Sequence, residues 1–333
     1  MRRRRFALAL AAAVLPGVAY AQSDWRRDAV PFYTPQDVAD AALRHWYLPQ
    51  SAAFVAAVQG LVAALQSGCG APAQRAWRDA LLAWVRLDAV AIGPLLERRS
   101  ARRLDFQPAR REAIERAVAQ GAYDEQALER VGSAAKGFAA LELLLWPAAT
   151  DAAHCRYALA LAEDIAREAE ALQQDFEART RQEPDDAAAA AALAELLNQW
   201  IGGLEQLRLQ GIARRLHASS GQRERPAREA SGTAQAERLE RWQALRSLAL
   251  FDGRRAPAPG SALLPLETLL RGKGLNPLAD RLRHAALPVG GALARPGGLP
   301  AAAQRLARLR HLAEAELAPA LDVRVGFSDA DGD

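Results

Sequence analysis

A single acid in a strongly apolar stretch is the residue of this chain whose chemistry most needs explaining. The stretch from Gly137 to Trp146 reads GFAALELLLW, and Glu142 is its only charged side chain. Lys136, one of only two lysines in the sequence, comes directly before it. Burying an unpaired charge is costly, so such a carboxylate needs a metal, a cation, a ligand or a hydrogen-bond donor. The identity of that partner decides what the site does.

The other residue types used in catalysis are present, but their spacing forms no familiar set. The sequence contains neither the H-E-x-x-H pair of zinc proteases nor a nucleophile elbow. A catalytic zinc needs three protein ligands and an open coordination position, and the sequence offers no set of three candidate ligands. His311 and Glu314 form an H-x-x-E, which we interpret as a solvated helix face. The histidines are scattered at His45, His154, His217, His284 and His311.

The first 21 residues have the pattern of an export signal. Arg2 to Arg5 precede an apolar stretch from Phe6 to Val18, and small residues lead to Ala21. We expect cleavage after Ala21 and a periplasmic protein. The arginines are compatible with both the general and the twin-arginine export route. The apolar stretch is too short to span a bilayer well, so we expect no integral membrane segment.

Cleavage of this leader would change the charge of the chain. The formal net charge of +4 equals the charge of the four leader arginines, and the leader contains no acid, so the mature chain is neutral. A neutral chain lacks the basic surface on which nucleic-acid affinity depends. We therefore expect no nucleic-acid partner.

Two cysteines, Cys69 and Cys155, are the only ones in the sequence. Compartments beyond an export signal are oxidising, and neither cysteine has the spacing of a metal or redox motif. We therefore predict a Cys69–Cys155 disulfide. In the chain-entropy account, closing so long a loop stabilises the fold by roughly 4 to 5 kcal/mol.

Composition and periodicity predict an all-α protein. Alanine and leucine dominate, whereas the β-branched residues that favour strands are scarce. Proline and then acids in residues 181–190 (RQEPDDAAAA) indicate a boundary between an N-terminal bundle, residues 22–182, and a C-terminal bundle, residues 183–333. Pro49 is expected to interrupt the first long helix. A second leucine-rich stretch, SALLPLETLLR, carries Glu267 and raises the possibility of a duplication.

Several stretches together resemble the imelysin family of exported bacterial proteins, some of which are classed as metallopeptidases. The resemblance implies an all-α fold of two helical-bundle halves, a periplasmic or surface location, and an association with iron uptake or redox systems. The stretches that carry it are AWVRLDAVAIGP (83–94), RRLDFQPAR (102–110), AAKGFAALELLLW (134–146), CRYALALAEDIA (155–166), SGTAQAERLERWQALRSL (231–248) and GFSDADGD (326–333).

The family signature G-x-H-x-x-E is incomplete in this chain. Gly137 and Glu142 match it, but Ala139 stands at the histidine position. Residues three apart share a helix face, so an imidazole and a carboxylate there could meet one ion. A methyl group coordinates nothing. The departure argues against iron or zinc as a cofactor and leaves Glu142 as the only candidate metal ligand.

Our leading hypothesis is a non-catalytic binding or accessory protein for iron uptake or an envelope redox system. It would bind an unknown small ligand, or an envelope iron or redox protein, between the two halves. Alternatively, Lys136, Arg103 and Glu142 pair with one another or cap helices, and so hold the bundles in register. The expected site consists of Lys136, Gly137, Glu142, Arg103, Ser231, Gly232, Asp331 and Asp333.

Two further functions remain open from the sequence. One is the metal-dependent peptidase that the family classification suggests, which the missing histidine makes difficult. The other is a structural or docking partner of an envelope iron or haem protein. The arginine-rich connector from Leu95 to Arg111 is either a solvated surface or a cationic rim around an anionic ligand.

Overall fold

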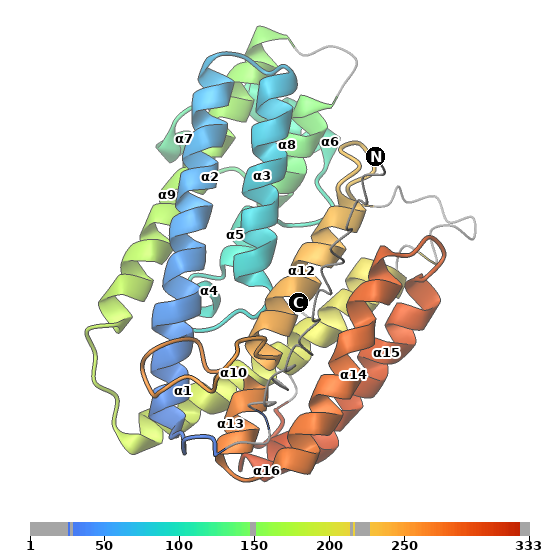
Figure 1. Ribbon diagram of the computed structural model, residues 1–333. Coiled ribbons are helices and arrows are strands. Elements are labelled where there is room, and N and C mark those ends of the chain that lie inside the picture. Colours follow the sequence, from blue (N-terminus) through green and yellow to red (C-terminus); the bar gives the residue numbers. More distant parts are fainter. Residues whose placement is uncertain (1–25, 27–28, 147–150, 214–215, 217–226, 327–333) are drawn as a thin grey trace, which may run out of the picture.

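The computed structural model describes residues 26, 29–146, 151–213, 216 and 227–326, and every regular element in these ranges is a helix. The predicted all-α fold of two helical-bundle halves is confirmed, with one group of long helices stacked above the other (Figure 1). The proposed signal peptide, residues 1–21, lies outside the described residues. The same holds for Asp331 and Asp333.

The N-terminal half is built on a hairpin that packs against a long helix. In this half, α2 packs against α3 and α9, and α8 lies against α9 and α3. Phe54, Trp77, Trp84 and Phe138 fill the space between these helices and are almost fully buried. Its helices are α2 (Leu48–Gln66), α3 (Ala71–Asp88), α8 (Gly137–Leu145) and α9 (Ala152–Arg179), with the short α4 (Pro94–Glu97), α5 (Ser100–Leu104), α6 (Arg111–Ala119), α7 (Glu125–Glu129) and η3 (Ser133–Ala135).

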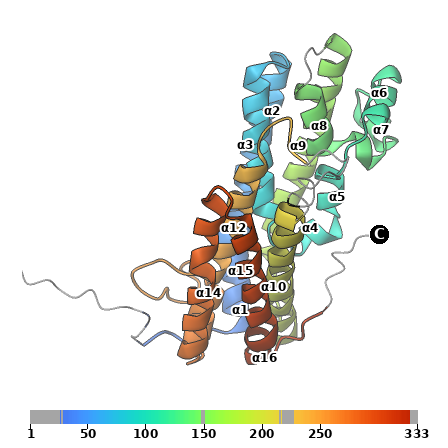
Figure 2. The ribbon, with the colours of Figure 1, turned by 90° about the vertical axis from the view of Figure 1, so that its right-hand side faces the viewer.

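The C-terminal half is a second helical layer at the opposite end of the molecule (Figure 2). In this half, α14 packs against α15 and α13, and α10 packs against α15. Its elements are α10 (Asp186–Gln206), η4 (Leu207–Ala213), α12 (Ala234–Ala249), α13 (Leu266–Gly272), α14 (Asn276–Ala294), α15 (Leu299–Leu312), η5 (Ala313–Leu317) and α16 (Ala318–Ala320).

Two elements connect the halves. The helix α1 (Pro35–Ala42) belongs to the first bundle by sequence but packs against α10 of the second. In the other direction, α12 lies across the junction, with α3 on one side and α14 on the other (Figure 1). Side chains on α12 can therefore meet partners from both bundles.

The first long helix runs through its proline, contrary to expectation. A capping box at Thr34 starts α1, the π-helical turn η2 (Leu43–Tyr47) continues it, and α2 follows without a break. The wider π turn lies immediately before Pro49, where the ring would otherwise clash with the preceding turn. The interruption predicted at Pro49 is therefore wrong.

The resulting helical run, Pro35–Gln66, is the one segment among the described residues that is long and apolar enough to cross a membrane. Within the fold it is a bundle helix, because Phe54, Val58 and Leu61 are fully buried between neighbouring helices. Much of its remaining surface is alanine, which raises hydropathy without requiring lipid.

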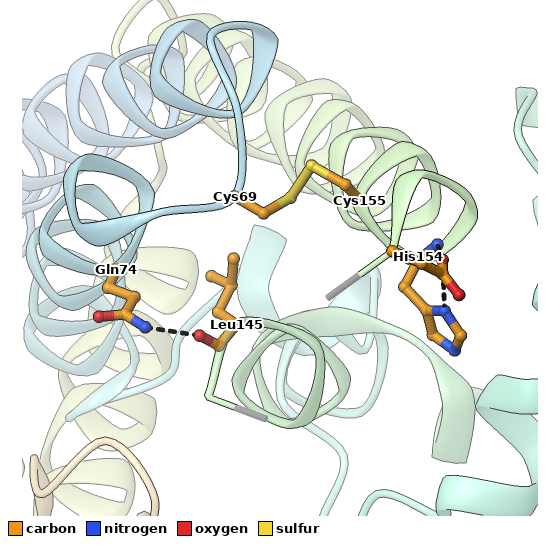
Figure 3. Close-up of a disulfide and its surroundings, with 6 residues drawn as sticks. Cys69, Gln74, Leu145, His154 and Cys155 are labelled. Atoms are coloured by element: carbon orange, nitrogen blue, oxygen red, sulfur yellow. Dashed lines mark hydrogen bonds and ion pairs between the residues drawn. A yellow bond between two sulfur atoms is a disulfide. The ribbon is translucent and has the colours of Figure 1, made fainter. Parts of the chain in front are cut away.

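The predicted disulfide is confirmed between Cys69 and Cys155. It joins the turn between α2 and α3 to the first turn of α9 (Figure 3). Close by, the Gln74 side-chain amide donates a hydrogen bond of 2.6 Å to the Leu145 carbonyl. The disulfide attaches the α2–α3 hairpin to α9, and the hydrogen bond attaches it to α8. Together they fix the end of α8 that follows Glu142.

Candidate functional site

The buried acid Glu142 meets hydrogen-bond donors from a segment far away in the sequence. It lies near the middle of α8, and its side chain is 8% exposed. Its Oε1 atom accepts hydrogen bonds from the Ser231 backbone N–H at 2.9 Å and the Ser231 hydroxyl at 2.7 Å. Its Oε2 atom lies 3.5 Å from Nη1 of Arg228. These contacts replace the water that a carboxylate loses on burial.

Arg228 is the cation of this site and joins three acids. Its side chain is 2% exposed. Nη2 donates to both carboxylate oxygens of Asp105 at 2.6 Å, and Nε donates to Glu237 at 3.1 Å. Burial lowers the pKa of Arg228, but the charges of Asp105, Glu237 and Glu142 outweigh it, so the net pKa is raised above the ordinary value. The guanidinium therefore stays charged.

Two hydroxyl groups complete a closed ring of polar contacts. The Thr233 hydroxyl donates to Glu237 at 2.9 Å and lies 3.0 Å from the Ser231 hydroxyl. The ring thus runs from Glu142 through Ser231, Thr233, Glu237 and Arg228 back to Glu142. Burial raises the pKa of Glu237, although Arg228 partly offsets this effect. We call Arg228, Asp105, Glu142, Glu237, Ser231 and Thr233 the acid-rich cluster.

The elements that position the acid-rich cluster come from both halves. Asp105 is the C-cap of α5, Glu142 lies on α8, and Glu237 is in the first turn of α12. Arg228 has a φ of 64°, a left-handed conformation that is uncommon outside glycine. Its guanidinium also lies 5.5 Å from the centre of the Trp77 ring, so the aromatic core of the N-terminal half supports it.

A second ion pair extends the polar contact along α12. Asp88, at the end of α3, accepts a hydrogen bond of 3.2 Å from Arg241. The same guanidinium donates to Gln206 of α10 at 2.7 Å. Burial raises the pKa of Asp88 to about 6, against the lowering effect of Arg241 and with a further increase from the charge of Asp105. The polar contacts at the junction of the two halves therefore continue from Glu237 to Arg241, about one turn further along α12.

The structure brings together only some of the residues expected at the site. Glu142 and Ser231 are hydrogen-bonded, and Gly232 follows with a φ of 71°, a conformation suited to glycine. A Cβ atom on Gly137 would lie 2.2 Å from the Leu104 carbonyl oxygen, so only glycine lets α8 start this close to α5. This contact gives the signature glycine a packing role.

The two predicted cations of the site have other partners. The Lys136 ammonium donates to the Leu128 carbonyl at 3.1 Å. Arg103 forms ion pairs with Glu168 at 3.2 Å and Asp164 at 3.5 Å, both on α9. Neither is paired with Glu142, so the expected pairing of Lys136, Arg103 and Glu142 differs from the structure. Arg228 supplies the charge instead.

Sequence reasoning missed Arg228, Asp105 and Glu237 as members of this site. Asp105 and Glu237 each stand in a stretch that carries the family resemblance, RRLDFQPAR and SGTAQAERLERW. The presence of an acid in each of these stretches could therefore have identified Asp105 and Glu237 as candidate site residues. Arg228 lies in a polar run whose sequence indicates only a loop, and no pattern distinguishes it from neighbouring arginines.

The donor set at this position does not fit a divalent metal ion. Ala139 presents no ligand, and all three nearby carboxylates are engaged by Arg228. Among the described residues, no three histidine, cysteine, aspartate or glutamate side chains are arranged to hold a metal ion. The arrangement instead suits an ion-paired polar junction.

A second buried acid, Glu267 on α13, has the opposite surroundings. Its Oε1 atom accepts from Arg26 at 3.1 Å, from Arg271 at 3.0 Å and from Arg283 at 2.9 Å. The Phe251 backbone N–H lies 3.3 Å from its Oε2 atom. We call Glu267, Arg26, Arg271 and Arg283 the arginine-rich cluster.

The chain is similar to a known protein family and to solved structures. The model of the imelysin family, peptidase M75, matches residues 41–294. Two solved structures share the fold. An imelysin-like protein from Psychrobacter arcticum 273-4 is 19% identical, with a TM-score of 0.72 over 90% of this chain and 100% of that chain. An iron-regulated protein A precursor from Parabacteroides distasonis ATCC 8503 is 15% identical, with a TM-score of 0.64 over 84% and 93%. No curated protein matches the chain.

Proposed function

Because the chain belongs to the imelysin family, we propose that it is an exported, non-catalytic binding or accessory protein of iron uptake or of an envelope redox system. The family match and the structural similarity to an iron-regulated protein precursor support an iron-associated role. The partner would be a small ligand or an envelope iron or redox protein that contacts both halves at the junction.

The acid-rich cluster is the observation that carries this proposal. Three carboxylates from α5, α8 and α12 meet one buried guanidinium where the bundles join. A metallopeptidase needs protein ligands that are free to hold an ion and a group that activates water. Here the acids are engaged by Arg228 and the signature histidine is Ala139, which favours binding over hydrolysis.

Export is supported by the leader and by the disulfide. Residues 1–21 have the composition of a signal peptide, and Cys69 and Cys155 are paired. Structural disulfides persist mainly in oxidising compartments. These features support a periplasmic location for the mature chain. Fractionation of cells that produce the full chain should recover a form shortened by the leader in the periplasmic extract. Recovery of the uncleaved chain in the cytoplasm would contradict export.

The binding role can be tested by complementation under iron limitation. A strain that lacks this protein should grow more slowly than its parent when iron is chelated, and the wild-type chain should restore growth. Glu142→Gln keeps the shape of the side chain but removes its charge, so it should fold and fail to restore growth. Glu240→Gln is the matched control, because Glu240 lies on α12 and pairs with Arg86 outside the cluster.

Three outcomes would separate the alternatives. Full complementation by Glu142→Gln would contradict a functional role for the cluster. A folded Glu142→Gln that fails, with Glu240→Gln active, supports it. Chelator-sensitive proteolysis by the purified wild-type chain, abolished in Glu142→Gln, would instead establish the peptidase activity that the family classification suggests.

A further inference from the structure

A third buried acid, Glu168 on α9, lies beside the helix that carries Asp105 into the acid-rich cluster. Its side chain is fully buried. Nε and Nη2 of Arg98 donate to its two carboxylate oxygens at 3.0 and 2.9 Å, and the Ser100 hydroxyl donates at 2.7 Å. Nη1 of Arg103 lies 3.2 Å from the same carboxylate. One acid therefore holds the chain from the end of α4 through most of α5.

The helix α5 depends on its neighbours for its position. It has five residues, which is too short for a helix that is stable by itself. Arg99, which precedes it, has a φ of 53°, in the left-handed region that is unfavourable for residues other than glycine. This turn brings Arg98 and Ser100 to the same carboxylate. A strained backbone persists only where surrounding contacts hold it, and here those contacts include Glu168.

The end of α5 determines where Asp105 lies. The Asp105 backbone N–H donates to the Ala101 carbonyl at 3.0 Å, and its carboxylate accepts from Nη2 of Arg228. The preceding Leu104 is buried, and its carbonyl oxygen lies against Gly137 at the start of α8. A shift of α5 relative to α9 would therefore carry Asp105 away from Arg228.

We propose that Glu168 is a positioning residue of the acid-rich cluster: by holding α5 against α9, it keeps Asp105 within reach of Arg228. The inference deepens the proposed function, on which its meaning for partner binding rests. The position of Asp105 can be followed without a partner, because its charge acts on Asp88. Burial raises the pKa of Asp88, Arg241 lowers it, and the charge of Asp105 raises it further.

The test follows the Asp88 carboxyl carbon by nuclear magnetic resonance as the pH is changed. In Glu168→Gln, Asp105 should move away, so the pKa of Asp88 should fall below its wild-type value. Asp175→Asn is the matched control, because it removes the same charge from the more exposed partner of Arg98 and should leave the pKa of Asp88 unchanged. A purely structural role would lower the melting temperature of Glu168→Gln without moving this pKa, and that result would overturn the proposal.

A double variant shows whether Glu168 acts through Asp105. Asp105→Asn should lower the pKa of Asp88 by removing the charge itself, and adding Glu168→Gln should then produce no further shift. A further shift as large as the one in Glu168→Gln alone would mean that Glu168 acts by another route, which also overturns the proposal.

A milder variant keeps the test informative if Glu168→Gln does not fold. Arg98→Lys retains the charge, but lysine cannot bind the carboxylate through two nitrogen atoms in a fixed plane. It should lower the pKa of Asp88 in the same direction and by a smaller amount. An unchanged pKa in a folded Arg98→Lys contradicts the proposal.

Growth under iron limitation separates this inference from the proposed function. Glu168→Gln should fail to restore growth, as Glu142→Gln does, whereas Asp175→Asn should restore it. Restored growth with both Glu168→Gln and Glu142→Gln would contradict the proposed function, while the Asp88 measurement decides the positioning role by itself. Restored growth with Glu168→Gln alone, together with an unshifted Asp88, would overturn the positioning role and leave the proposed function standing.

Discussion

The two buried acids Glu142 and Glu267 occupy similar helices but differ in how their charge is balanced. Both lie on short leucine-rich helices, and both have an almost completely buried side chain. In the acid-rich cluster one arginine serves three acids, whereas in the arginine-rich cluster three arginines serve one acid. Arg228 is therefore the central cation of the first cluster and Glu267 the central anion of the second, although Arg271 also pairs with Asp280 and Arg283 with Asp252.

The difference matters for function as well as for stability. The arginine-rich cluster collects its cations at α13, from the N-terminal segment, α13 itself and α14. The acid-rich cluster takes its members from both halves and lies where α12 crosses the junction. The acid-rich cluster is therefore placed where binding of a partner could change how the long helices of the two halves meet.

The largest expected effect is the loss of either central residue. Arg228→Ala and Glu267→Ala should each lower the free energy of unfolding by about 3–5 kcal/mol, because each removes the buried partner of several charged groups. After Glu267→Ala, Arg271 and Arg283 keep only the more exposed Asp280 and Asp252. Urea denaturation measures the change. Arg281→Ala, which breaks an ion pair with Glu316 on the surface, is the control and should cost less than about 1 kcal/mol. If Arg228→Ala and Glu267→Ala lowered the free energy of unfolding no more than Arg281→Ala does, the two central residues would not hold their clusters together.

A second prediction concerns the ion pair of Asp88 and Arg241, which lies next to the acid-rich cluster on α12. The raised pKa of Asp88, about 6 against an ordinary 3.8, means that the folded chain holds a proton there that the unfolded chain has released. Stability from this group is therefore greatest at low pH and is lost as the pH rises from about 4 to about 6. The full change is about 3 kcal/mol for a shift of this size.

Asp88→Asn should remove this component of the pH dependence. The quantity to measure is the difference in unfolding free energy between variant and wild type from about pH 4 to pH 7. Relative to wild type, the variant should gain stability as the pH rises. Parallel curves for the two proteins would refute the burial argument.

A third prediction compares one peripheral residue from each cluster. Glu142→Gln should cost about 1.5–3 kcal/mol, since it removes the charge that accepts from Ser231 and faces Arg228. Arg283→Ala should cost about 1 kcal/mol, because Arg26 and Arg271 still neutralise Glu267. Thermal unfolding of the two variants under one condition tests the order. A reversed order would mean that the arginine-rich cluster is the less redundant of the two.

The sequence predicts the helical class and the disulfide, and it places Glu142 and the Ser231 segment in one site, because composition, cysteine number and motif order are properties of the chain itself. It does not predict the partners of Lys136 and Arg103. Lys136 stands next to α8 in sequence, but its extended backbone directs the side chain to the Leu128 carbonyl. Arg103 faces Glu168 because α5 packs beside α9, which is a tertiary relation.

The misassigned proline and the missed arginine have related causes. The local preference of proline indicates a break at Pro49, but burial of Phe54 and Val58 favours a continuous helix. The π turn before Pro49 makes room for the proline ring. Arg228 adopts its left-handed backbone in a segment without periodicity. In both cases packing with remote helices overrides what the neighbouring residues prefer.

The smallest expected effect concerns the hydroxyl groups, which occur in the ring of the acid-rich cluster. Thr233→Val keeps the shape of the side chain and removes the donor to Glu237, so it should cost about 1 kcal/mol. Loss of this bond also removes an influence that lowers the pKa of Glu237, so its proton should be held to a higher pH. Nuclear magnetic resonance titration of the Glu237 carboxyl carbon measures that shift. An unchanged titration would mean that Thr233 fills space without donating to Glu237, and the ring would then depend on Arg228 and Ser231 alone.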